Sequence, residues 1–292
     1  RLMDLKGIDP WNEDGTENEQ WKKFLDQFTL KQMTEMVEFG KFRSIAIDAL
    51  GIPEGIHPDG PFGFVGQEPD HGSARCYYVS PNIVAATFNK ELMEKQGAMI
   101  GEEGAWMGYN GLYGPGVNIH RTPFSGRNFE YYSEDAFLTG ITAAYVTKGM
   151  QSKGVFPFLK HFALNDQETD RNGVTTFATE QAMREIYLKA FQLAIDVDST
   201  SNIWSADYNG HKGALGIMSS FNRVGYEWAG SNYALLTTVL REEWGFKGLV
   251  VTDWFNGGYM DQTRMIRAGN DLSLAMSQQI TPLVNNKDIG AA

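Results

Sequence analysis

The sequence predicts an α/β fold, a (β/α)8 TIM-barrel-like domain, on the basis of three observations. First, strand-like and helix-like segments alternate along most of the chain, a pattern typical of a parallel sheet with helical crossovers. Second, polar residues follow nearly every expected strand, as they do around the rim of a barrel. Third, the glycine-rich residues 111–116 lack the G-x-G-x-x-G spacing and lead into a strand, which disfavours an open nucleotide-binding sheet.

Composition sets the class of protein and excludes several partners. The 292 residues are 42% hydrophobic and 21% charged, which is ordinary for a globular chain with a sizeable core. A net charge of −11 without a run of Lys or Arg argues against nucleic acid or an anionic membrane surface as partner. No apolar stretch approaches the roughly 18 residues of a membrane span, so no membrane partner is expected.

The cysteine count bears on localisation. Cys76 is the single cysteine, so an intrachain disulfide framework is excluded, and a cytoplasmic location is slightly favoured over a secreted one. The chain begins at Arg1 without a methionine or a signal peptide, so we expect a processed or excerpted segment.

We expect three parts along the chain. They are a lead-in segment with the first helix, a TIM-barrel-like domain, and a C-terminal tail or linker toward another domain, at residues 1–39, 40–275 and 276–292. Residues 1–20 are polar and acidic. Residues 21–39 carry apolar side chains at helical spacing, with a break near Thr29.

The first half of the expected barrel contains a loop, two helices and a strand. Residues 52–61 are rich in Gly and Pro and should form the loop. Asn89 can cap one helix, and residues 134–135 open another, because acidic residues in a first turn complement the helix dipole. Residues 111–119 should form a short strand that leads into a loop.

The second half continues the alternation. Strands are expected at residues 155–162 and 214–221, and helices are expected at residues 180–195 and 259–268. Residues 197–213 are polar and irregular, so we expect a surface insertion before the second of these strands.

Asp253 ends a short apolar, β-branched run at residues 248–252 and is followed at once by Trp254. The helix before this run can begin at a Ser231 cap and end at Gly245. A carboxylate that ends a buried strand is held rigidly at the rim where barrels place their chemistry. An aspartate beside an indole suits a site that cleaves sugars. The alternative is an aspartate that caps the following turn.

Other polar residues stand at the ends of further expected strands, namely Asp59, Arg127, Lys160, His161 and Arg171. Taken singly, Asp59 is a good turn residue and Arg127 can pair with Glu130. His161 in an apolar strand is more often a satisfied core histidine. Together with Asp253 these residues would share one rim, and the set therefore predicts a polar ligand site.

Several short motifs occur in a fixed order over roughly residues 40–275. They are Asp59-Gly60-Pro61, Gly126-Arg127-Asn128-Phe129-Glu130, Ser133-Glu134-Asp135, Lys160-His161-Phe162 with Asn165 and Glu168, Met218-Ser219-Ser220-Phe221-Asn222, Thr252-Asp253-Trp254 and Gly269-Asn270-Asp271-Leu272. With these motifs the chain resembles glycoside hydrolase family 3, the β-glucosidase and β-xylosidase family, and the resemblance implies a TIM-barrel-like catalytic domain.

The resemblance also implies an activity and a set of site residues. The activity is that of a retaining, exo-acting β-glycosidase. We favour a β-glucosidase acting on terminal non-reducing β-D-glucosyl residues, with a β-xylosidase as the alternative. Asp253 would be the nucleophile, and Met218 and Trp254 would form apolar walls. The residues that would bind sugar hydroxyls are Asp59, Arg127, Lys160, His161 and Arg171. No metal or organic cofactor is implied.

Electrostatic expectations follow from these roles. A retaining glycosidase needs one ionised carboxylate about 5–5.5 Å from a protonated one. We expect Lys160, Arg171 and, if charged, His161 to lower the pKa of Asp253. We also expect Asp59 and Lys160, as buried residues, to hold sugar hydroxyls bidentately.

Two residues depart from the pattern of the family. Val65 stands where an Arg is usual, and Phe221 stands where a Tyr hydroxyl commonly steadies the nucleophile. These departures keep open a sugar-binding homologue that does not hydrolyse its ligand. The β-N-acetylglucosaminidase subgroup is disfavoured, because Phe162 is followed by Ala-Leu-Asn rather than Pro-Gly-His.

No acid/base glutamate can be assigned from the sequence. The resemblance implies that this residue comes from a separate α/β sandwich domain, in cis or in trans, which these 292 residues do not contain. Glu168 and Glu103 are candidates within the chain, and we favour neither. The expected partners are therefore a small β-glucoside or oligosaccharide and the sandwich domain.

Overall fold

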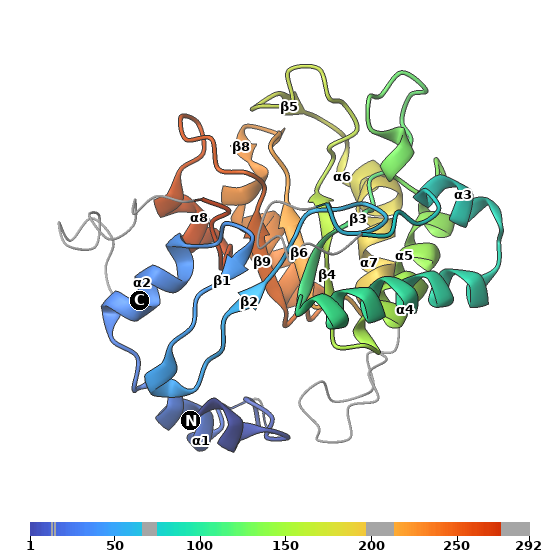
Figure 1. Cartoon of the computed structure of the whole chain (residues 1–292). Helices are drawn as coiled ribbons and strands as arrows, with labels where there is room; N and C mark the ends of the chain where they lie inside the picture. The colour runs from blue at the N-terminus through green and yellow to red at the C-terminus, as the bar shows by residue number, and fades with distance from the viewer. Residues whose placement is uncertain (13, 15, 66–74, 197–212, 276–292) are drawn as a thin grey trace.

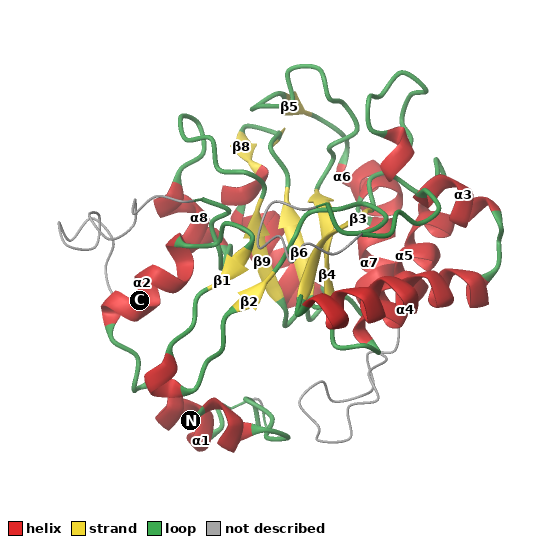
Figure 2. Cartoon of the chain, viewed as in Figure 1, coloured by secondary structure: helices red, strands yellow, loops and turns green. Residues whose placement is uncertain are grey.

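A parallel sheet forms the centre of the molecule. The computed structural model describes residues 1–12, 14, 16–65, 75–196 and 213–275. The sheet has the order β3-β4-β6-β9, with all neighbours parallel, at Gly111–Gly116, Phe156–Phe162, Gly216–Ser219 and Leu249–Thr252. Figures 1 and 2 show these strands at the centre, with α4, α5 and α7 beside them.

Short segments extend the sheet at its β3 edge. Asp59 forms a parallel bridge with Tyr113 of β3. Just before Asp59, β2 (Gly55–Ile56) pairs antiparallel with β1 (Arg43–Ser44). The segments that carry β1, β2 and Asp59 therefore continue the wall of the barrel beyond β3.

The opposite edge of the sheet meets these segments and closes a ring. Leu272 forms a parallel bridge with Val251 of β9. The Ser273 oxygen accepts a hydrogen bond from the Gly40 N–H at 3.1 Å, and the Ser273 N–H donates to Val37 O at 2.8 Å. Gly40 has no side chain to clash, since a Cβ there would overlap the Ser273 oxygen. Backbone hydrogen bonds thus run around the whole wall.

The fold is TIM-barrel-like, as the sequence predicts, although part of the wall is irregular. The expected loop at residues 52–61 contains the two-residue strand β2. Pro53, Pro58 and Pro61 have no N–H to donate to a ladder, so pairing there is limited to single bridges and short strands.

Helices pack around the outside of the sheet. The α-helices are α1 Glu19–Leu25, α2 Leu30–Glu38, α3 Pro81–Ala86, α4 Lys90–Met107, α5 Ala136–Gln151, α6 Glu180–Ala182, α7 Lys189–Asp196 and α8 Gln262–Ala268. The π-helical segments are η4 Met183–Tyr187 and η6 Ala234–Glu243. Short 3-10 turns lie at Leu2–Leu5, Asp48–Leu50, Asn128–Glu130 and Ala229–Ser231.

The strands separate an outer apolar cluster from an inner one. Ile217 and Val250 belong to the outer cluster, between the sheet and the helices. Their neighbours Met218 and Val251 belong to the inner cluster, because successive side chains of a strand point to opposite faces. The inner cluster also contains Phe42, Tyr113, Phe158, Leu272 and Leu274.

A second, small sheet stands beyond the ends of the barrel strands. It has the order β5-β7-β8, at Thr175–Thr176, Arg223–Val224 and Glu227–Trp228. Figure 1 shows β5 and β8 above the central strands, with α1 at the opposite edge of the molecule. The loops that lead from β4 to β5 and from β6 to β7 therefore border the carboxyl ends of the barrel strands.

Most expected helices are present, but some details differ. Thr29 caps α2 and accounts for the predicted break at that residue. The helix expected at residues 180–195 is divided into α6, η4 and α7. Before Asp253, the predicted Ser231 cap is wrong: the Asn232 side chain accepts the Leu235 N–H at 3.0 Å, while the Ser231 hydroxyl donates to Trp228 O.

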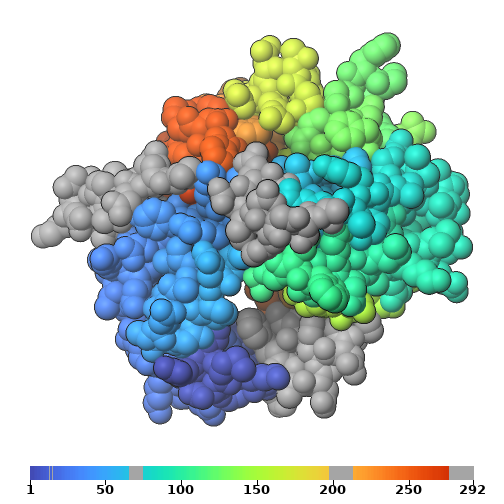
Figure 3. Space-filling view, viewed as in Figure 1, coloured from blue at the N-terminus to red at the C-terminus, as the bar shows by residue number. Residues whose placement is uncertain are grey.

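The first helices pack on the lower edge of the barrel wall. Leu5 and Phe24 share an apolar cluster with Ile47 and Leu50. Figure 3 shows this N-terminal part, in dark blue, at the lower edge of the molecule. The predicted tail at 276–292 and all but Gly213 of the predicted insertion at 197–213 lie outside the described residues. Among the helices of the described residues, none has the length and apolar character needed to cross a membrane.

Candidate functional site

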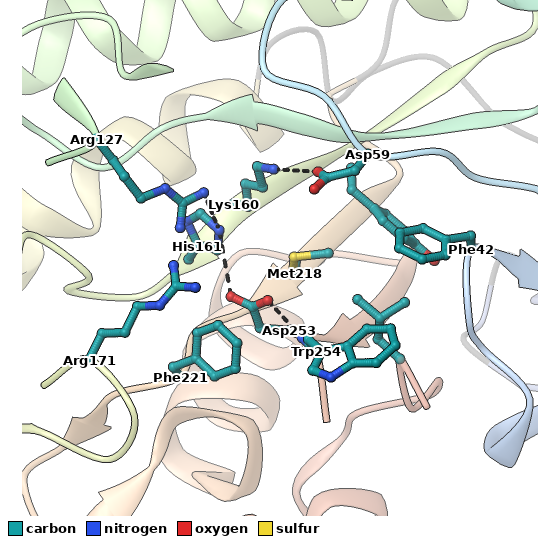
Figure 4. A pocket seen from close by; sticks show the side chains of 12 residues that line it. Phe42, Asp59, Arg127, Lys160, His161, Arg171, Met218, Phe221, Asp253 and Trp254 are labelled. Atoms are coloured by element: carbon teal, nitrogen blue, oxygen red, sulfur yellow. Dashed lines mark hydrogen bonds and ion pairs between the residues drawn. The ribbon is translucent and has the colours of Figure 1, made fainter. Parts of the chain in front are cut away.

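A pocket opens at the carboxyl ends of β4, β6 and β9. Its volume of about 400 Å³ lies in the range of small-molecule sites. It is lined by all eight predicted site residues, Asp59, Arg127, Lys160, His161, Arg171, Met218, Asp253 and Trp254, and in addition by Phe42, Tyr113, Phe221 and Leu274. Figure 4 shows these side chains converging from opposite sides of the pocket.

The ends of the strands position the polar side chains. Lys160 and His161 belong to β4, whose pairing with β6 shifts register between Leu159 and Phe162. Asp253 directly follows β9, and its N–H donates to Ser219 O of β6 at 3.0 Å. The backbone of Asp253 is therefore anchored in the sheet while its side chain reaches the pocket.

Asp253 has one oxygen atom that is bonded and one that is not. Oδ1 accepts the Trp254 N–H at 2.7 Å. Within the described part of the chain, Oδ2 is buried and accepts no hydrogen bond. It lies 3.6 Å from His161 Nε2. An unpartnered carboxylate oxygen inside a pocket is available to a ligand, which makes Oδ2 the reactive candidate of the site.

The pKa of Asp253 is set mainly by burial. Burial raises it to about 6, and the Trp254 N–H together with Arg127, Lys160 and Arg171 lowers it without cancelling the effect of burial. Lys160 and Arg171 do lower this pKa, as expected, but the expectation left out burial, which is larger and raises the pKa overall. Removal of water from a carboxylate disfavours its charged form more than these three cations favour it.

His161 is neutral and has a defined tautomer. Burial and the charges of Arg127, Lys160 and Arg171 hold its pKa well below the usual value, so the charged form that the sequence left open does not apply. Arg127 donates to Nε2 at 3.1 Å, and because a guanidinium cannot accept, Nε2 carries no proton. Nδ1 then donates to the Tyr131 hydroxyl at 3.1 Å. Nε2 consequently cannot donate to Asp253, which explains why Oδ2 stays free.

Lys160 and Asp59 form an ion pair on the opposite side of the pocket. Lys160 Nζ lies 2.7 Å from Asp59 Oδ1. The Lys160 side chain is 4% exposed, as expected, whereas that of Asp59 is 51% exposed. The expectation that Asp59 is buried is therefore wrong, because its carboxylate faces the open pocket. The pair presents both an acceptor and a donor to a ligand.

Arg171 enters the pocket beside Phe221. Its guanidinium lies 4.8 Å from the centre of the Phe221 ring, a cation–π geometry. Its Nη1 donates to Glu168 Oε2 at 2.9 Å. Val65, the other departure from the family pattern, does not line the pocket, and its N–H donates to Asp59 O at 2.7 Å.

An apolar wall completes the pocket. The Trp254 ring is 39% exposed and lies 6.2 Å from the Phe42 ring, and Met218 lies deeper, 3% exposed. The sequence pattern did not point to Phe42 and Leu274, because their segments form only short or single-bridge pairings. A ring-binding surface next to charged donors suits a molecule with one apolar face and several hydroxyl groups.

Few carboxylates of the described residues could act as an acid in this pocket. Among the residues that the structure describes, Asp59 and Asp253 are the carboxylates that line it, and Asp59 is engaged by Lys160. Glu168 binds Arg171, and Glu103 accepts from the Tyr78 hydroxyl and the Cys76 N–H outside the pocket. In the described ranges, no group of three or more His, Cys, Asp or Glu side chains could hold a metal ion.

Glu130 lies next to the pocket, and the sequence pointed to it only as a possible ion-pair partner of Arg127. Glu130 is 5% exposed and accepts two hydrogen bonds from Arg127, at 2.8 and 2.7 Å. The sequence signal was its spacing of three residues from Arg127. Its proximity to Lys160, at 3.7 Å, arises from the fold and has no signal in the sequence.

Sequence comparisons identify relatives of this chain. The profile of the Glycosyl hydrolase family 3 N terminal domain matches residues 29–289. A β-glucosidase of Ruminococcus albus is 38% identical over 234 residues, which cover 77% of this chain and 23% of the relative. Beta-glucosidase A of Butyrivibrio fibrisolvens is 36% identical over 240 residues, covering 82% and 27%. The chain thus spans about a quarter of the length of these curated relatives.

Solved structures similar to this chain are also β-glucosidases. β-Glucosidase 3B from Thermotoga neapolitana in complex with glucose has a TM-score of 0.81 at 31% identity, over 93% of this chain and 40% of that chain. A β-glucosidase from Kluyveromyces marxianus in complex with glucose has a TM-score of 0.81 at 29% identity, over 91% and 31%. By profile, identity and fold, this chain belongs to glycosyl hydrolase family 3.

Proposed function

We propose that this chain is the catalytic barrel of a retaining, exo-acting β-glucosidase that cleaves terminal non-reducing β-D-glucosyl residues. The observation that carries the proposal is the buried, unbonded Oδ2 of Asp253 in a pocket lined by sugar-sized polar and aromatic groups. A carboxylate oxygen without a hydrogen-bond partner is costly to bury, and such a cost is typical of a functional residue such as a nucleophile.

Asp253 acts as the nucleophile in a two-step reaction. In the first step Oδ2 forms a bond to the anomeric carbon while an acid protonates the departing glycosidic oxygen. In the second step the same group, now a base, takes a proton from water, and the water oxygen displaces Asp253. The sugar leaves with its original anomeric configuration, and the carboxylate and the acid are restored.

The other lining residues bind the sugar ring. Asp59 accepts from sugar hydroxyls, and Lys160, Arg127 and Arg171 donate to them. His161 is held neutral between Arg127 and Tyr131, so it adds a polar surface without a second charge beside Asp253.

The apolar wall takes the other side of the sugar. Trp254, Phe42 and Met218 contact the C–H face of the ring. The printed names of the relatives, β-glucosidases, and the glucose in two related structures support glucose as the bound sugar.

The acid/base group is supplied from outside the described residues. Neither Asp59, bound to Lys160, nor Glu168, bound to Arg171, is a free acid facing Asp253. We assign the group to a glutamate of a sandwich domain, in cis or in trans. The short coverage of the curated relatives, 23% and 27%, leaves ample sequence for such a domain in proteins of this kind.

A second candidate is a pocket that binds sugar without cleaving it. Phe221 favours this alternative, because a phenyl ring offers Asp253 no hydroxyl to hold its carboxylate in the ionised form. A β-xylosidase is a third reading within the same reaction class, and no described contact separates it from the β-glucosidase.

A trapping experiment tests the nucleophile without needing the acid. Dinitrophenyl 2-deoxy-2-fluoro-β-glucoside has a leaving group that departs unprotonated, so the chain should become glycosylated even in the absence of a sandwich domain. Peptide mapping by mass spectrometry should find the label on Asp253, and Asp253→Asn should remain unlabelled. Label on another residue rejects this nucleophile. Glucose binding with no label on the wild type supports the non-hydrolytic alternative.

A further inference from the structure

We propose that Glu130 is a positioning residue of the sugar pocket, whose carboxylate holds Arg127 and Lys160 in the orientation that presents their donors to the ligand. This inference rests on the proposed function, because it assumes that the pocket binds a sugar. Glu130 itself is not a lining residue, whereas both of its partners are.

The fold places Glu130 between these two cations. The adjacent Tyr131 forms a parallel bridge with Gly116 of β3, and Gly116 is in register with Lys160 of β4. Glu130 is thereby held beside the end of β4. Its Oε1 accepts from Arg127 Nη2 at 2.7 Å and lies 3.7 Å from Lys160 Nζ, and its Oε2 accepts from Arg127 Nε at 2.8 Å.

The surroundings of Glu130 make it a fixed negative charge. Burial alone would raise its pKa, but Lys160 and Arg127 outweigh burial and hold the pKa below the usual value. The side chain is 6% exposed and that of Lys160 is 4% exposed, so water screens neither strongly. Without this carboxylate, Arg127 and Lys160 would face each other as like charges in a buried place.

Glu130 is the third of six residues in a continuous series of alternating charges along the pocket. The series is Asp59, Lys160, Glu130, Arg127, Glu168 and Arg171, with successive contacts of 2.7, 3.7, 2.7, 3.7 and 2.9 Å. Each cation of the pocket is therefore held by at least one carboxylate before a ligand arrives. Donors that are already oriented lose less freedom on binding, which favours affinity.

An amide cannot replace this carboxylate. In Glu130→Gln, the side-chain NH2 group would point a donor at Arg127 or Lys160, neither of which can accept a hydrogen bond. The two cations would then turn away from each other and from the positions that meet the sugar. Glu130→Asp keeps the charge on a shorter side chain and should restore part of the affinity.

Glucose affinity, measured by titration calorimetry on the whole chain, tests the proposal. Glu130→Gln should weaken glucose binding by roughly 10-fold or more, the loss expected for one charge-assisted hydrogen bond, and Glu130→Asp should fall between it and the wild type. The control is Asp271→Asn. Asp271 accepts from Arg241 and from the Val250 N–H, both at 2.7 Å, and does not line the pocket.

Monodeoxy glucoses separate positioning from a general loss of structure. In the wild type, removal of the hydroxyl that Arg127 or Lys160 binds should weaken binding most. In Glu130→Gln the same removal should cost markedly less, because the donors are already displaced. A purely structural Glu130 would lower the melting temperature, as Asp271→Asn should, and leave the relative cost of each hydroxyl unchanged.

The outcomes separate this inference from the proposed function. Wild-type affinity in both Glu130 variants, or an unaltered deoxy pattern, overturns the role of Glu130 even if the fluoroglucoside labels Asp253. Conversely, a clear Glu130 effect on glucose affinity without any label on Asp253 retains the positioning role and rejects the proposed hydrolysis. If Glu130→Gln does not fold, the deoxy pattern of Glu130→Asp decides the question by the same criterion.

Discussion

The hydrogen bonding of His161 explains why one oxygen of Asp253 is free. His161 Nε2 is occupied by a donor from Arg127 and cannot bond Asp253, which therefore has a free Oδ2. Burial raises the pKa of Asp253 to about 6. In the proposed mechanism this free Oδ2 is the atom that attacks the sugar, while Oδ1 is held by the Trp254 N–H.

The raised pKa predicts an acid limit for the chemistry. Asp253 has a pKa of about 6, and in the proposed mechanism it attacks only when ionised. The rate of labelling by the fluoroglucoside should therefore fall as pH drops below about 6. The decline should approach tenfold per pH unit. The second-order rate constant for inactivation should be measured from about pH 4 to pH 8. Its decline at low pH reports the pKa of Asp253 in the protein without bound ligand.

Arg171→Gln provides the internal comparison for that experiment. Arg171 is among the cations that lower the pKa of Asp253, so its removal should make the labelling rate begin to fall at a higher pH. The shift should be small, because the Arg171 side chain is 36% exposed. A labelling rate that stays constant down to about pH 4 would contradict the assignment of this pKa to the nucleophile.

At the scale of single residues, the motifs predicted which side chains face the pocket, but not their exposure or the direction of their pKa shifts. Asp59, Lys160 and Asp253 were expected from their motifs, and all three line the cavity. The motifs carry no information on how much water each carboxylate loses. For that reason the exposure of Asp59 and the direction of the Asp253 shift became visible only in the fold.

Secondary structure was predictable where elements have strong local signals. The strands β4, β6 and β9 are apolar and bounded by polar residues, and α4 begins at the expected Asn89 cap. The start of η6 was not predictable, because Ser231 and Asn232 are both good caps. The choice depends on where the preceding turn ends, and a distant residue, Asn270, fixes that turn by donating to Gly230 O at 2.6 Å.

Paired substitutions at the start of η6 test which residue caps it. Asn232→Ala removes the acceptor of the Leu235 N–H and should lower the free energy of unfolding by about 1 kcal/mol. Ser231→Ala loses only a 3.3 Å bond to Trp228 O and should change it by less than about 0.5 kcal/mol. Urea unfolding followed by circular dichroism measures both. The reverse order of effects would restore Ser231 as the cap.

At the scale of the whole molecule, closure of the barrel depends on contacts between distant residues. Gly40 and Ser273, near opposite ends of the described chain, join the two edges of the wall. Neither lies in a run that local pattern identifies as a strand, so the sequence predicts the class of fold but not how its ring closes. The same closure brings Phe42 and Leu274 into the pocket.

Closure also encloses His57, which links stability to pH. Its backbone N–H donates to Phe42 O at 2.8 Å, and its ring lies among Tyr113, Phe156 and Phe158. Within the described residues neither ring nitrogen has a hydrogen-bond partner. Burial lowers the pKa of His57 from 6.5 to about 4. The folded protein therefore keeps this histidine neutral at pH values where the unfolded chain protonates it.

His57→Gln should consequently flatten the acid side of the stability curve. Above pH 6.5 the neutral histidine carries no penalty. As pH falls toward about 4, His57 binds a proton in the unfolded chain but not in the folded protein, so the free energy of unfolding decreases. Over this range the wild type should lose stability faster than His57→Gln, by up to about 1.4 kcal/mol per pH unit.

Urea unfolding of both proteins at several pH values measures the difference, in which the contributions of the titratable groups common to both proteins cancel. Parallel curves would mean that His57 is protonated equally in the folded and unfolded states, and its burial would then not be the source of acid sensitivity.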